Sequence, residues 1–446
     1  MSETRAAIPP GPKGRRLVGN SYDYDRDRIG FLRRNQAEFG DVFSFSAGTV
    51  FVSDPGLVHD LLNRTNSDFL AEAPVFVDAE ESAELERNVD GWMRSRKIGF
   101  QGLTRSVTRA HGERIAAEFE RTLDSTGGSQ VDVTALMRDF TARMVADFLF
   151  GPGAEDVVAA TDLRSDLVIK YMASNFSVPK WLPLPSVRRA NRAEADVQRT
   201  ISAHVDDRIA HPHATPEDML DLLLVDADSG LTRHNIVALL AASMLASFGS
   251  PGAAMSWAIA EMSRDAEVHA QLREEALRVL AEGGTLVDDG PLTYSKAFVR
   301  EVLRLHPPTW LMGRKARNET TLGDWTVRRG QDVMFSPYLL QRDPRWWTEP
   351  DELRPERWLE NVASEARRAY IPFGSGPRVC IGLHLSLYQL ATAVSRLAAY
   401  YQIDPTSAAP ESVPGAILTP GGLRASFTRI AQPAPAADGL VSGVAP

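Results

Sequence analysis

The segment IPFGSGPRVCIG, residues 371–382, contains the only cysteine of this 446-residue chain. A thiolate can bind haem iron from one axial side, and its electron density favours cleavage of an O–O bond. Such a sulfur needs backbone N–H donors nearby, and Gly374, Gly376 and Gly382 allow the backbone to come close. The helix expected just after Cys380 directs its positive end at the sulfur and favours the thiolate. The alternatives are a buried structural cysteine and a redox cysteine, which would lack a second thiol to resolve it.

The loop resembles the haem-binding signature of the cytochrome P450 family, which the chain matches at Phe373, Gly374, Gly376, Arg378, Cys380 and Gly382. The resemblance implies haem b, iron protoporphyrin IX, with Cys380 as the axial ligand of the metal. It also implies a mainly α fold with small β-sheets, in which the haem lies between a long kinked central helix and the cysteine loop. It extends over roughly residues 8–430, and its specific motifs cluster in residues 290–385.

A second motif of this family precedes the cysteine loop. Glu301 and Arg304 are three residues apart, on one face of a helix predicted at residues 294–306. Alone, such a pair is commonly an exposed ion pair that contributes little stability. The resemblance implies that Arg357, in LRPERW, completes a Glu-Arg-Arg network. We expect the network to be buried and to fix the chain that leads to Cys380.

Haem propionates need cations or hydrogen-bond donors. Trp92 and Arg96 are four residues apart on one helix face, and they resemble the family's Trp-x-x-x-Arg pair beside the haem. Arg314 stands where the family places another propionate-binding Arg, and Arg378 is a third candidate. The resemblance therefore implies that these four residues bind the cofactor. Taken singly, each Arg is equally well explained as an ordinary solvated side chain.

Residues 232–263 form the longest apolar segment, which predicts a helix of roughly 48 Å. In the family this helix carries an acid followed by an alcohol, which organise proton delivery to bound oxygen. Gly249 stands where the acid belongs and Ser250 where the alcohol belongs, so the acid is absent.

Pro251 follows immediately, lacks an N–H and clashes with the carbonyl of Ser247, so we expect a kink there. Gly249 and Ser250 are thus the candidate catalytic positions. We expect Ser250, ordered water or the substrate itself to supply protons. The alternative is an ordinary kinked helix in which Ser250 only caps a carbonyl.

The resemblance places substrate contacts in the loop 71–90, the Pro-rich region 171–186, the long helix and two later turns. Candidate wall residues are Phe76, Phe176, Ala246, Phe248, Trp310, Leu311 and Leu418. Ordinary packing explains each of them equally well. Their apolar character indicates a lipophilic small molecule, such as a terpenoid or a polyketide-like secondary metabolite.

The remaining patterns predict mostly helices. Alternating residues predict a β-hairpin at 41–55, and residues 320–338 predict short strands with glycine turns. Helices are expected at residues 56–70, 92–125, 131–151, 294–306 and 383–401, and a long amphipathic helix is expected after the Pro-rich loop. We expect a single catalytic domain at 1–430, followed by a flexible Pro/Ala-rich tail at 431–446.

The chain carries 49 Lys and Arg against 58 Asp and Glu, which gives a net charge of −9. An acidic chain is a poor general binder of nucleic acid or anionic membranes. A single cysteine excludes an internal disulfide, which suits a reducing cytoplasm. The N-terminus lacks a signal-peptide core, and no uncharged apolar run reaches about 18 residues. We therefore expect a cytoplasmic protein without a membrane span.

These features predict a haem-thiolate monooxygenase that inserts one oxygen atom from O2 into its substrate. The chain has no motif for a fused flavin or iron–sulfur domain, so electrons must arrive from outside it. The resemblance to the soluble bacterial type implies NAD(P)H, ferredoxin and ferredoxin reductase. Basic residues along 94–114 would steer an acidic ferredoxin, and an ordinary solvated helix face explains them equally well. The missing acid leaves two alternatives open. One is a peroxide-driven or redox-independent enzyme, such as a peroxygenase or a rearranging or dehydrating catalyst, and the other is a non-catalytic haem protein that binds gas.

Overall fold

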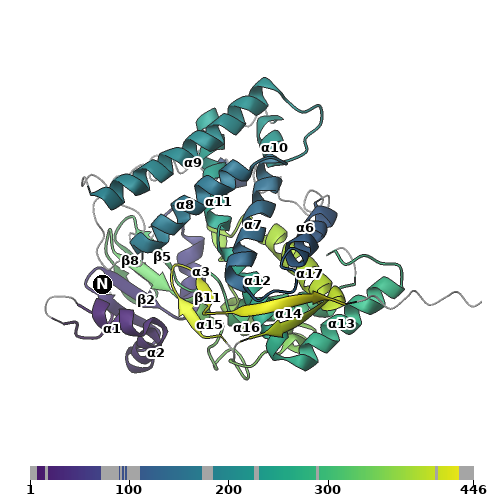
Figure 1. The fold of residues 1–446 in the computed structure, drawn as a ribbon. Coiled ribbons are helices and arrows are strands. Elements are labelled where there is room, and N and C mark those ends of the chain that lie inside the picture. The colour runs from purple at the N-terminus through teal and green to yellow at the C-terminus, as the bar shows by residue number, and fades with distance from the viewer. Residues whose placement is uncertain are drawn as a thin grey trace, which may run out of the picture.

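The computed structural model describes residues 8–15, 19–71, 90, 93–94, 96–97, 111–172, 184–225, 231–287, 291–406 and 410–430. Most of these residues are helical, and small sheets flank the helices (Figure 1). The expected mainly α fold with small β-sheets is confirmed. Phe76, Trp92 and Phe176 lie outside the described residues.

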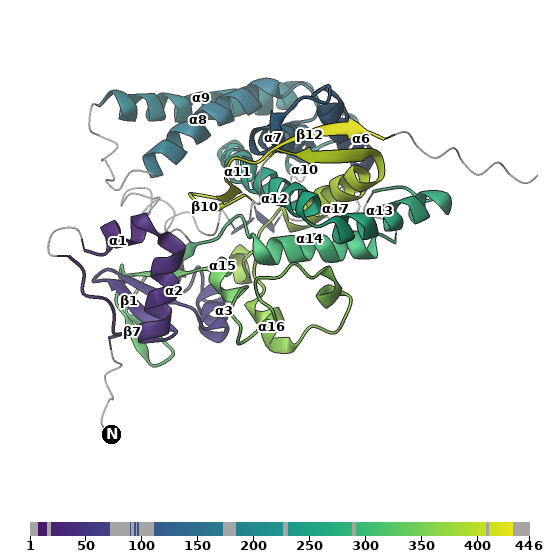
Figure 2. The same ribbon diagram turned by 60° about the horizontal axis from the view of Figure 1, so that its bottom comes forward.

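The long helices α8 and α9 pack side by side on the outside of the bundle, while α12 and α17 lie inside it (Figure 2). The helices are α1 (Ser21–Arg26), α2 (Arg28–Phe39), α3 (Pro55–Asn63), α6 (Gly112–Asp124), α7 (Val133–Phe150), α8 (Glu155–Met172), α9 (Pro185–Ala210), α10 (Met219–Val225), α11 (Arg233–Ser247), α12 (Ser250–Arg264), α13 (Ala266–Ala281), α14 (Thr293–Leu305), α15 (Pro337–Leu340), α16 (Ser364–Ala369) and α17 (Leu383–Tyr400).

Local capping explains why several helices end where the sequence predicts. The side chain of Asp132 accepts a hydrogen bond from the N–H of Ala135 at the start of α7. Gly151 ends α7 with φ 82°, a conformation that glycine adopts without a steric penalty. The helices predicted at 131–151, 294–306 and 383–401 are confirmed with small shifts at their ends.

A five-stranded sheet beside the bundle has the order β1-β2-β8-β5-β3. The predicted hairpin at 41–55 is confirmed as an antiparallel pair, and β2 continues in parallel with β8. The strands are β1 (Val42–Ser46), β2 (Thr49–Val52), β3 (Phe69–Leu70), β5 (Met312–Ala316) and β8 (Asp332–Phe335).

Three smaller sheets complete the described part of the fold. One has the order β4-β12-β9, and the other two are the pairs β6-β7 and β10-β11. Their strands are β4 (Val131–Asp132), β6 (Thr320–Leu322), β7 (Trp325–Val327), β9 (Tyr401–Pro405), β10 (Ser412–Pro414), β11 (Leu418–Pro420) and β12 (Arg424–Arg429). The β10-β11 hairpin packs against α12 and therefore lies next to the centre of the molecule.

Two sequence predictions of helices need correction. The helix predicted at 56–70 ends at Asn63, because the chain then turns through Asn66, which has φ 77°, and enters strand β3. The continuous helix predicted at 232–263 is two helices, α11 and α12, separated at residues 248–249. Of the helix predicted at 92–125, the structure describes its last part as α6 and only isolated residues before residue 111.

Helix α12 forms the centre of the main hydrophobic core. It packs against α7, α14 and α17, and residues 252–262 are all buried. Within the described residues, one stretch, 233–264, is long and apolar enough to cross a membrane by length and composition alone. A core helix passes the same test, and burial of α12 inside the protein accounts for its apolar composition.

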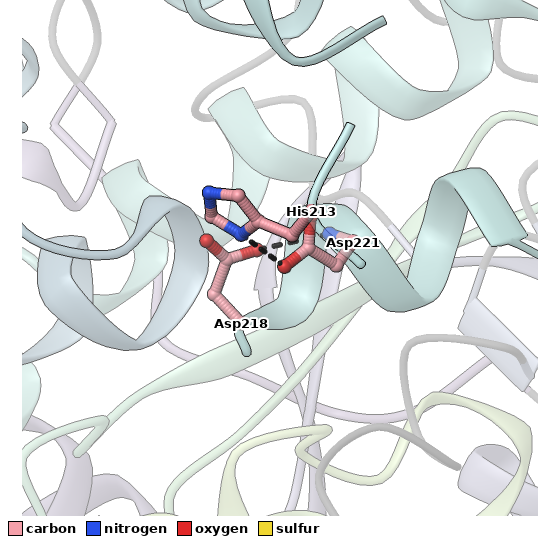
Figure 3. A group of neighbouring side chains, drawn as sticks. All are labelled: His213, Asp218 and Asp221. Atoms are coloured by element: carbon pink, nitrogen blue, oxygen red, sulfur yellow. Dashed lines mark hydrogen bonds and ion pairs between the residues drawn. The ribbon is translucent and has the colours of Figure 1, made fainter. Parts of the chain in front are cut away.

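A buried polar cluster fixes the connection between α9 and α10. Figure 3 shows His213, Asp218 and Asp221, whose ligand atoms lie within 4.8 Å of one another, as in a metal site. Arg208 donates to the carboxylates of both Asp218, at 2.8 Å, and Asp221, at 2.5 Å. Asp218 also accepts the N–H of Asp221 at the start of α10. Because the guanidinium already supplies the positive charge, the cluster is explained as a structural ion pair.

Candidate active site

An internal cavity of about 290 Å³ separates the cysteine loop from the junction of α11 and α12. The loop contributes Phe373, Gly374 and Cys380 to the lining, while Ser250 lines it from the junction. The other lining residues are predominantly apolar and come mostly from α7, α11, α12 and α17, with single residues from α10, α14 and β5. A cysteine thiol therefore opens into an apolar cavity beneath a helix, as a thiolate-bound haem requires.

The cysteine loop is held in a tight fold by its own backbone. The N–H of Cys380 donates to the carbonyl of Phe373 at 2.9 Å, and the N–H of Gly374 donates to Ile371 at 3.0 Å. Gly374 and Gly376 have φ 69° and 71°, which disfavour any other residue. A Cβ on Gly376 would also lie 2.5 Å from the carbonyl oxygen of Leu62, so the loop and α3 approach closely here.

Two groups next to the Cys380 sulfur oppose the effect of burial on its pKa. Burial raises the pKa of the Cys380 thiol, while the N–H of Gly382 and the charge of Arg96 oppose this shift. The predicted donor at the start of α17 is therefore present, but the surroundings alone do not favour the thiolate. A metal cation deprotonates a coordinating thiol outright, so ligation would complete the charge balance.

Three of the predicted propionate-binding residues are described. Arg96 donates to the carbonyl of Val379 at 2.6 Å, one residue before the cysteine. Arg314 is buried on β5 and donates to the hydroxyl of Thr65 at 3.0 Å. Arg378 lines the cavity, and its Nε donates to Asn66 at 3.1 Å. The turn after α3 thus brings Arg314 and Arg378 together, which spacing in the sequence did not reveal.

Glu301, Arg304 and Arg357 come together as the sequence predicted. Glu301 and Arg304 are both fully buried and form two hydrogen bonds, at 2.8 and 2.9 Å. The Nε of Arg357 donates to Glu301 at 2.9 Å. Arg304 also donates to the carbonyls of Gln341, Pro350 and Glu352, so it holds the long chain segment before the cysteine loop.

Two members of this network were not predicted from the sequence. The indole of Trp358 donates to Glu301 at 2.8 Å. Gln341 donates to the carbonyls of Leu303 and Arg304, and it accepts the N–H of Ile371, where the cysteine loop begins. Gln341 is the direct link from the ion-pair network to the loop, but an isolated Gln carries no sequence signal.

The profile of the family described as cytochrome P450 matches residues 9–424, nearly the whole chain. The chain belongs to the cytochrome P450 family. It is accordingly an oxidoreductase of a monooxygenase family, and the family implies a haem cofactor, which the residues around Cys380 fit.

Relatives of this P450 occur in plants, animals and bacteria. Ferruginol synthase from Salvia miltiorrhiza is 25% identical over 87% of this chain and 86% of its own length. Cyclooctatin synthase from Streptomyces melanosporofaciens is 32% identical over 67% of this chain and 68% of its own. A cyanobacterial P450, CYP120A1, solved with retinoic acid bound, has a TM-score of 0.79 at 20% identity, covering 95% of this chain and 100% of its own. This last similarity supports the fold.

Gly249, at the position of the missing acid, lies at the junction between α11 and α12. A Cβ on Gly249 would lie 2.5 Å from Cδ1 of Ile417, in the turn of the β10-β11 hairpin. Gly249 precedes α12, and its carbonyl accepts the N–H of Ala253 at 2.8 Å. The expected kink at Pro251 is therefore a complete break two residues earlier, with Pro251 in the first turn of the new helix.

The predicted wall residues of this P450 divide into two groups. Ala246 lines the cavity. Phe248, Trp310 and Leu418 are buried and are not among its lining residues, so their assignment to the substrate wall stays a prediction. Leu311 is likewise not among them and packs against the cluster that contains Trp310 and Leu418. Apolar wall residues that the sequence analysis missed include Val145, Phe148, Leu149, Leu239, Leu240, Ala254 and Met312.

A buried imidazole joins α12 to the end of α14. His306 donates or accepts through Nε2 at 2.7 Å from Glu261, stacks on Trp257 with ring centroids 3.8 Å apart, and has no partner at Nδ1 among the described residues. Burial lowers the pKa of His306 from 6.5 to about 4, although the bond to Glu261 opposes this shift. The neutral imidazole, donating to the Glu261 carboxylate, is thus the stable form.

This arrangement predicts loss of stability in mild acid. Between pH 6.5 and about 4, the unfolded chain protonates His306 while the folded chain does not, so the free energy of unfolding falls as pH falls, by up to about 3 kcal/mol. His306→Gln removes this titration and should flatten the dependence measured by urea unfolding. His234→Gln, at an exposed position, is the control and should keep it. Equal pH dependence in wild type and His306→Gln would refute the assignment.

Proposed function

We propose that this P450 is a haem-thiolate monooxygenase that inserts one oxygen atom from O2 into a lipophilic small molecule of the terpenoid class. The observation that carries the proposal is the cavity between Cys380 and Ser250, which is lined by a thiol, a hydroxyl and mostly apolar side chains. The walls exclude water and hold an apolar substrate, whereas the thiol supplies an iron ligand.

Different residues of the chain would bind different parts of haem b. Cys380 would bind the iron, and the glycine loop would hold its sulfur in place. Arg96, Arg314 and Arg378 would neutralise the propionates, and Trp92, which lies outside the described residues, would donate a hydrogen bond to them. A thiolate-bound haem supplies activation of O2 for insertion into a C–H or C=C bond. The protein orients the substrate and manages the protons.

Proton supply would depend on Ser250, because Gly249 offers no side chain. Ser250 lines the cavity one residue after the break, so its hydroxyl can hold a proton at the substrate side. Ser250→Ala is expected to reduce product formed per NAD(P)H oxidised by about tenfold, since water replaces a positioned donor poorly. Ser263→Ala, on the same helix but away from the cavity, should leave this ratio unchanged. Unchanged coupling in Ser250→Ala would remove Ser250 from the proton path.

Names of relatives support the substrate class. Ferruginol synthase, cyclooctatin synthase and cyclooctat-9-en-7-ol 5-monooxygenase are terpenoid-related enzymes. The cavity of this chain is lined mainly by apolar residues, of which Leu is the most frequent, and these suit a hydrocarbon skeleton. We therefore favour a terpenoid over a polyketide, in the biosynthesis of a secondary metabolite.

Electron supply is inferred to come from a ferredoxin and its reductase in the cytoplasm. Arg94 and Lys97 are exposed on the segment that also places Arg96 beside Val379, close to the cysteine. Exposed cations near the cysteine would attract an acidic ferredoxin. We further infer that residues 1–430 form one catalytic domain, while the tail predicted at residues 431–446 lies outside the described residues.

Isotope labelling tests the proposal. Purified protein with ferredoxin, ferredoxin reductase and NAD(P)H should oxidise members of a terpenoid panel under O2 of the heavy oxygen isotope. One labelled oxygen atom per product, with equimolar consumption of NAD(P)H, O2 and substrate, is the expected result. Product without label from O2 would contradict monooxygenation.

A second candidate is favoured by the absent acid at Gly249. In a peroxide-driven enzyme, hydrogen peroxide supplies the inserted oxygen atom and also the protons. Such an enzyme has less need of a proton relay. Turnover with peroxide that exceeds turnover with O2, ferredoxin and NAD(P)H would favour this candidate. Product formation with neither oxidant would instead indicate a rearrangement or dehydration, and absence of any turnover across the panel would favour a gas-binding protein.

A further inference from the structure

The β10-β11 hairpin is anchored directly to the elements that carry the α11–α12 break. Trp257 of α12 donates its indole N–H to the carbonyl of Leu418 at 3.1 Å, and the N–H of Leu418 donates to Pro308 at 2.9 Å. The indole of Trp310 donates to the carbonyl of Gly415 at 2.8 Å. These three bonds flank the turn that carries Ile417 and fix its position relative to α12.

Ile417 packs against the break at Gly249. Its Cδ1 lies 2.5 Å from the place where a Cβ on Gly249 would stand, so a side chain at position 249 would force the end of the Ile417 side chain to move. On the other side of the same break, Ser250 lines the cavity. Pro251 has no N–H, so the break cannot be closed by the hydrogen bond to Ser247 that a continuous helix would form.

We propose that Ile417 is a positioning residue, which holds the α11–α12 break in place and thereby sets the hydroxyl of Ser250 toward the cavity. Side-chain packing from the hairpin replaces the backbone hydrogen bond that the helix has lost at Pro251. A larger residue at position 249 would displace this contact. The part concerning Ser250 rests on the proposed function, whereas the packing contact does not.

A double-mutant cycle on the purified haem-loaded protein tests the contact. Ile417→Val removes Cδ1, the atom that a Cβ at position 249 would meet. Gly249→Ala is expected to lower the midpoint of thermal unfolding by about 3 °C in the wild type, and by much less in the Ile417→Val background. An equal loss in both backgrounds would overturn the contact, and this readout is independent of any substrate.

The amount of product formed per NAD(P)H oxidised tests the effect of Ile417 on Ser250. Without well-placed protons, NAD(P)H, a proton and O2 yield NAD(P)+ and hydrogen peroxide instead of product. Ile417→Ala is expected to reduce product per NAD(P)H by about tenfold, with recovery in Ile417→Leu, which restores the δ carbons. Val413→Ala, at an exposed position of the same hairpin, is the matched control. Unchanged coupling in a folded Ile417→Ala protein would overturn the positioning role.

The two failures are distinguishable. An equal effect of Gly249→Ala on the unfolding midpoint in the wild type and in Ile417→Val refutes the packing of Ile417 on Gly249. This holds even when the wild type is an active monooxygenase. Absence of turnover in the wild type refutes the proposed function while the thermal cycle still reports on the contact. If Ile417→Ala does not fold, Ile417→Val carries the coupling measurement, with a smaller loss expected and an unchanged ratio counting against the role.

Discussion

Replacing Glu301 by Ala is expected to eliminate most folded, haem-loaded protein. The carboxylate of Glu301 accepts hydrogen bonds from Arg304, Arg357, Trp358 and the backbone N–H of Arg354. Its loss would leave the guanidinium of Arg304, which is fully buried, without its anion. Removing one partner of a buried ion pair costs about 3–5 kcal/mol, a large part of the 5–15 kcal/mol that typically stabilises a native domain.

The expected loss extends to the cofactor because the network leads to the cysteine loop. Arg304 donates a hydrogen bond to the carbonyl of Gln341, in the segment before the loop. The side chain of Gln341 accepts the N–H of Ile371, where the loop begins. Expression of the variant should therefore give a low haem-to-protein ratio by absorbance and a reduced unfolding midpoint.

A matched control separates this effect from loss of any ion pair. Asp206→Ala removes an ion pair with Arg233 whose side chains are 57% and 46% exposed, and such exposed pairs contribute little to stability. Haem loading should be normal in this control. Normal loading and stability in Glu301→Ala would show that the network is dispensable and would contradict its proposed role.

Replacing Gly376 by Ala is expected to have the second largest effect. Gly376 combines φ 71° with a Cβ position that lies 2.5 Å from the oxygen and 2.8 Å from the carbonyl carbon of Leu62. Both neighbouring atoms belong to the backbone of α3, so no side-chain rotation relieves the clash. The loop must shift, and overpacking of this kind costs about 1–3 kcal/mol, in addition to the strain of a positive φ.

The shift would move Arg378 and Cys380 together, since both follow within four residues. We therefore expect a lower haem-to-protein ratio and a lower unfolding midpoint in Gly376→Ala. Gly48→Ala, in the β1–β2 turn, is the control because no atom lies within 4 Å of its Cβ position and its φ is not positive. If both variants load haem and unfold like the wild type, the tight approach of the loop to α3 is not required.

Sequence reasoning succeeded where the chemistry is local. The cysteine loop and the Glu301–Arg304 pair are defined by spacings within one loop or one helix turn, and Arg357 followed from the family pattern. Capping residues such as Asp132 and Gly151 similarly determine the ends of α7, because they act on the nearest backbone groups.

The rest depends on contacts between distant segments. Asn66, Gln341 and Trp358 hold the site through residues far away in the chain, and their types carry no distinctive signal. The break at Gly249 was predicted as a kink at Pro251 because the packing of Ile417 could not be foreseen. Residue type alone does not distinguish a cavity lining from a filled core, so the assignment of the buried Trp310 and Leu418 to the substrate wall stays a prediction.

Ligation of iron by Cys380 is tested most directly by the absorption spectrum of the reduced protein with carbon monoxide. Wild-type protein should show the Soret band position of thiolate-ligated haem, and Cys380→Ala should lose that band even where haem remains bound. A wild-type band typical of nitrogen ligation, or the same thiolate-type band in Cys380→Ala, would contradict the assignment of the sulfur as the iron ligand.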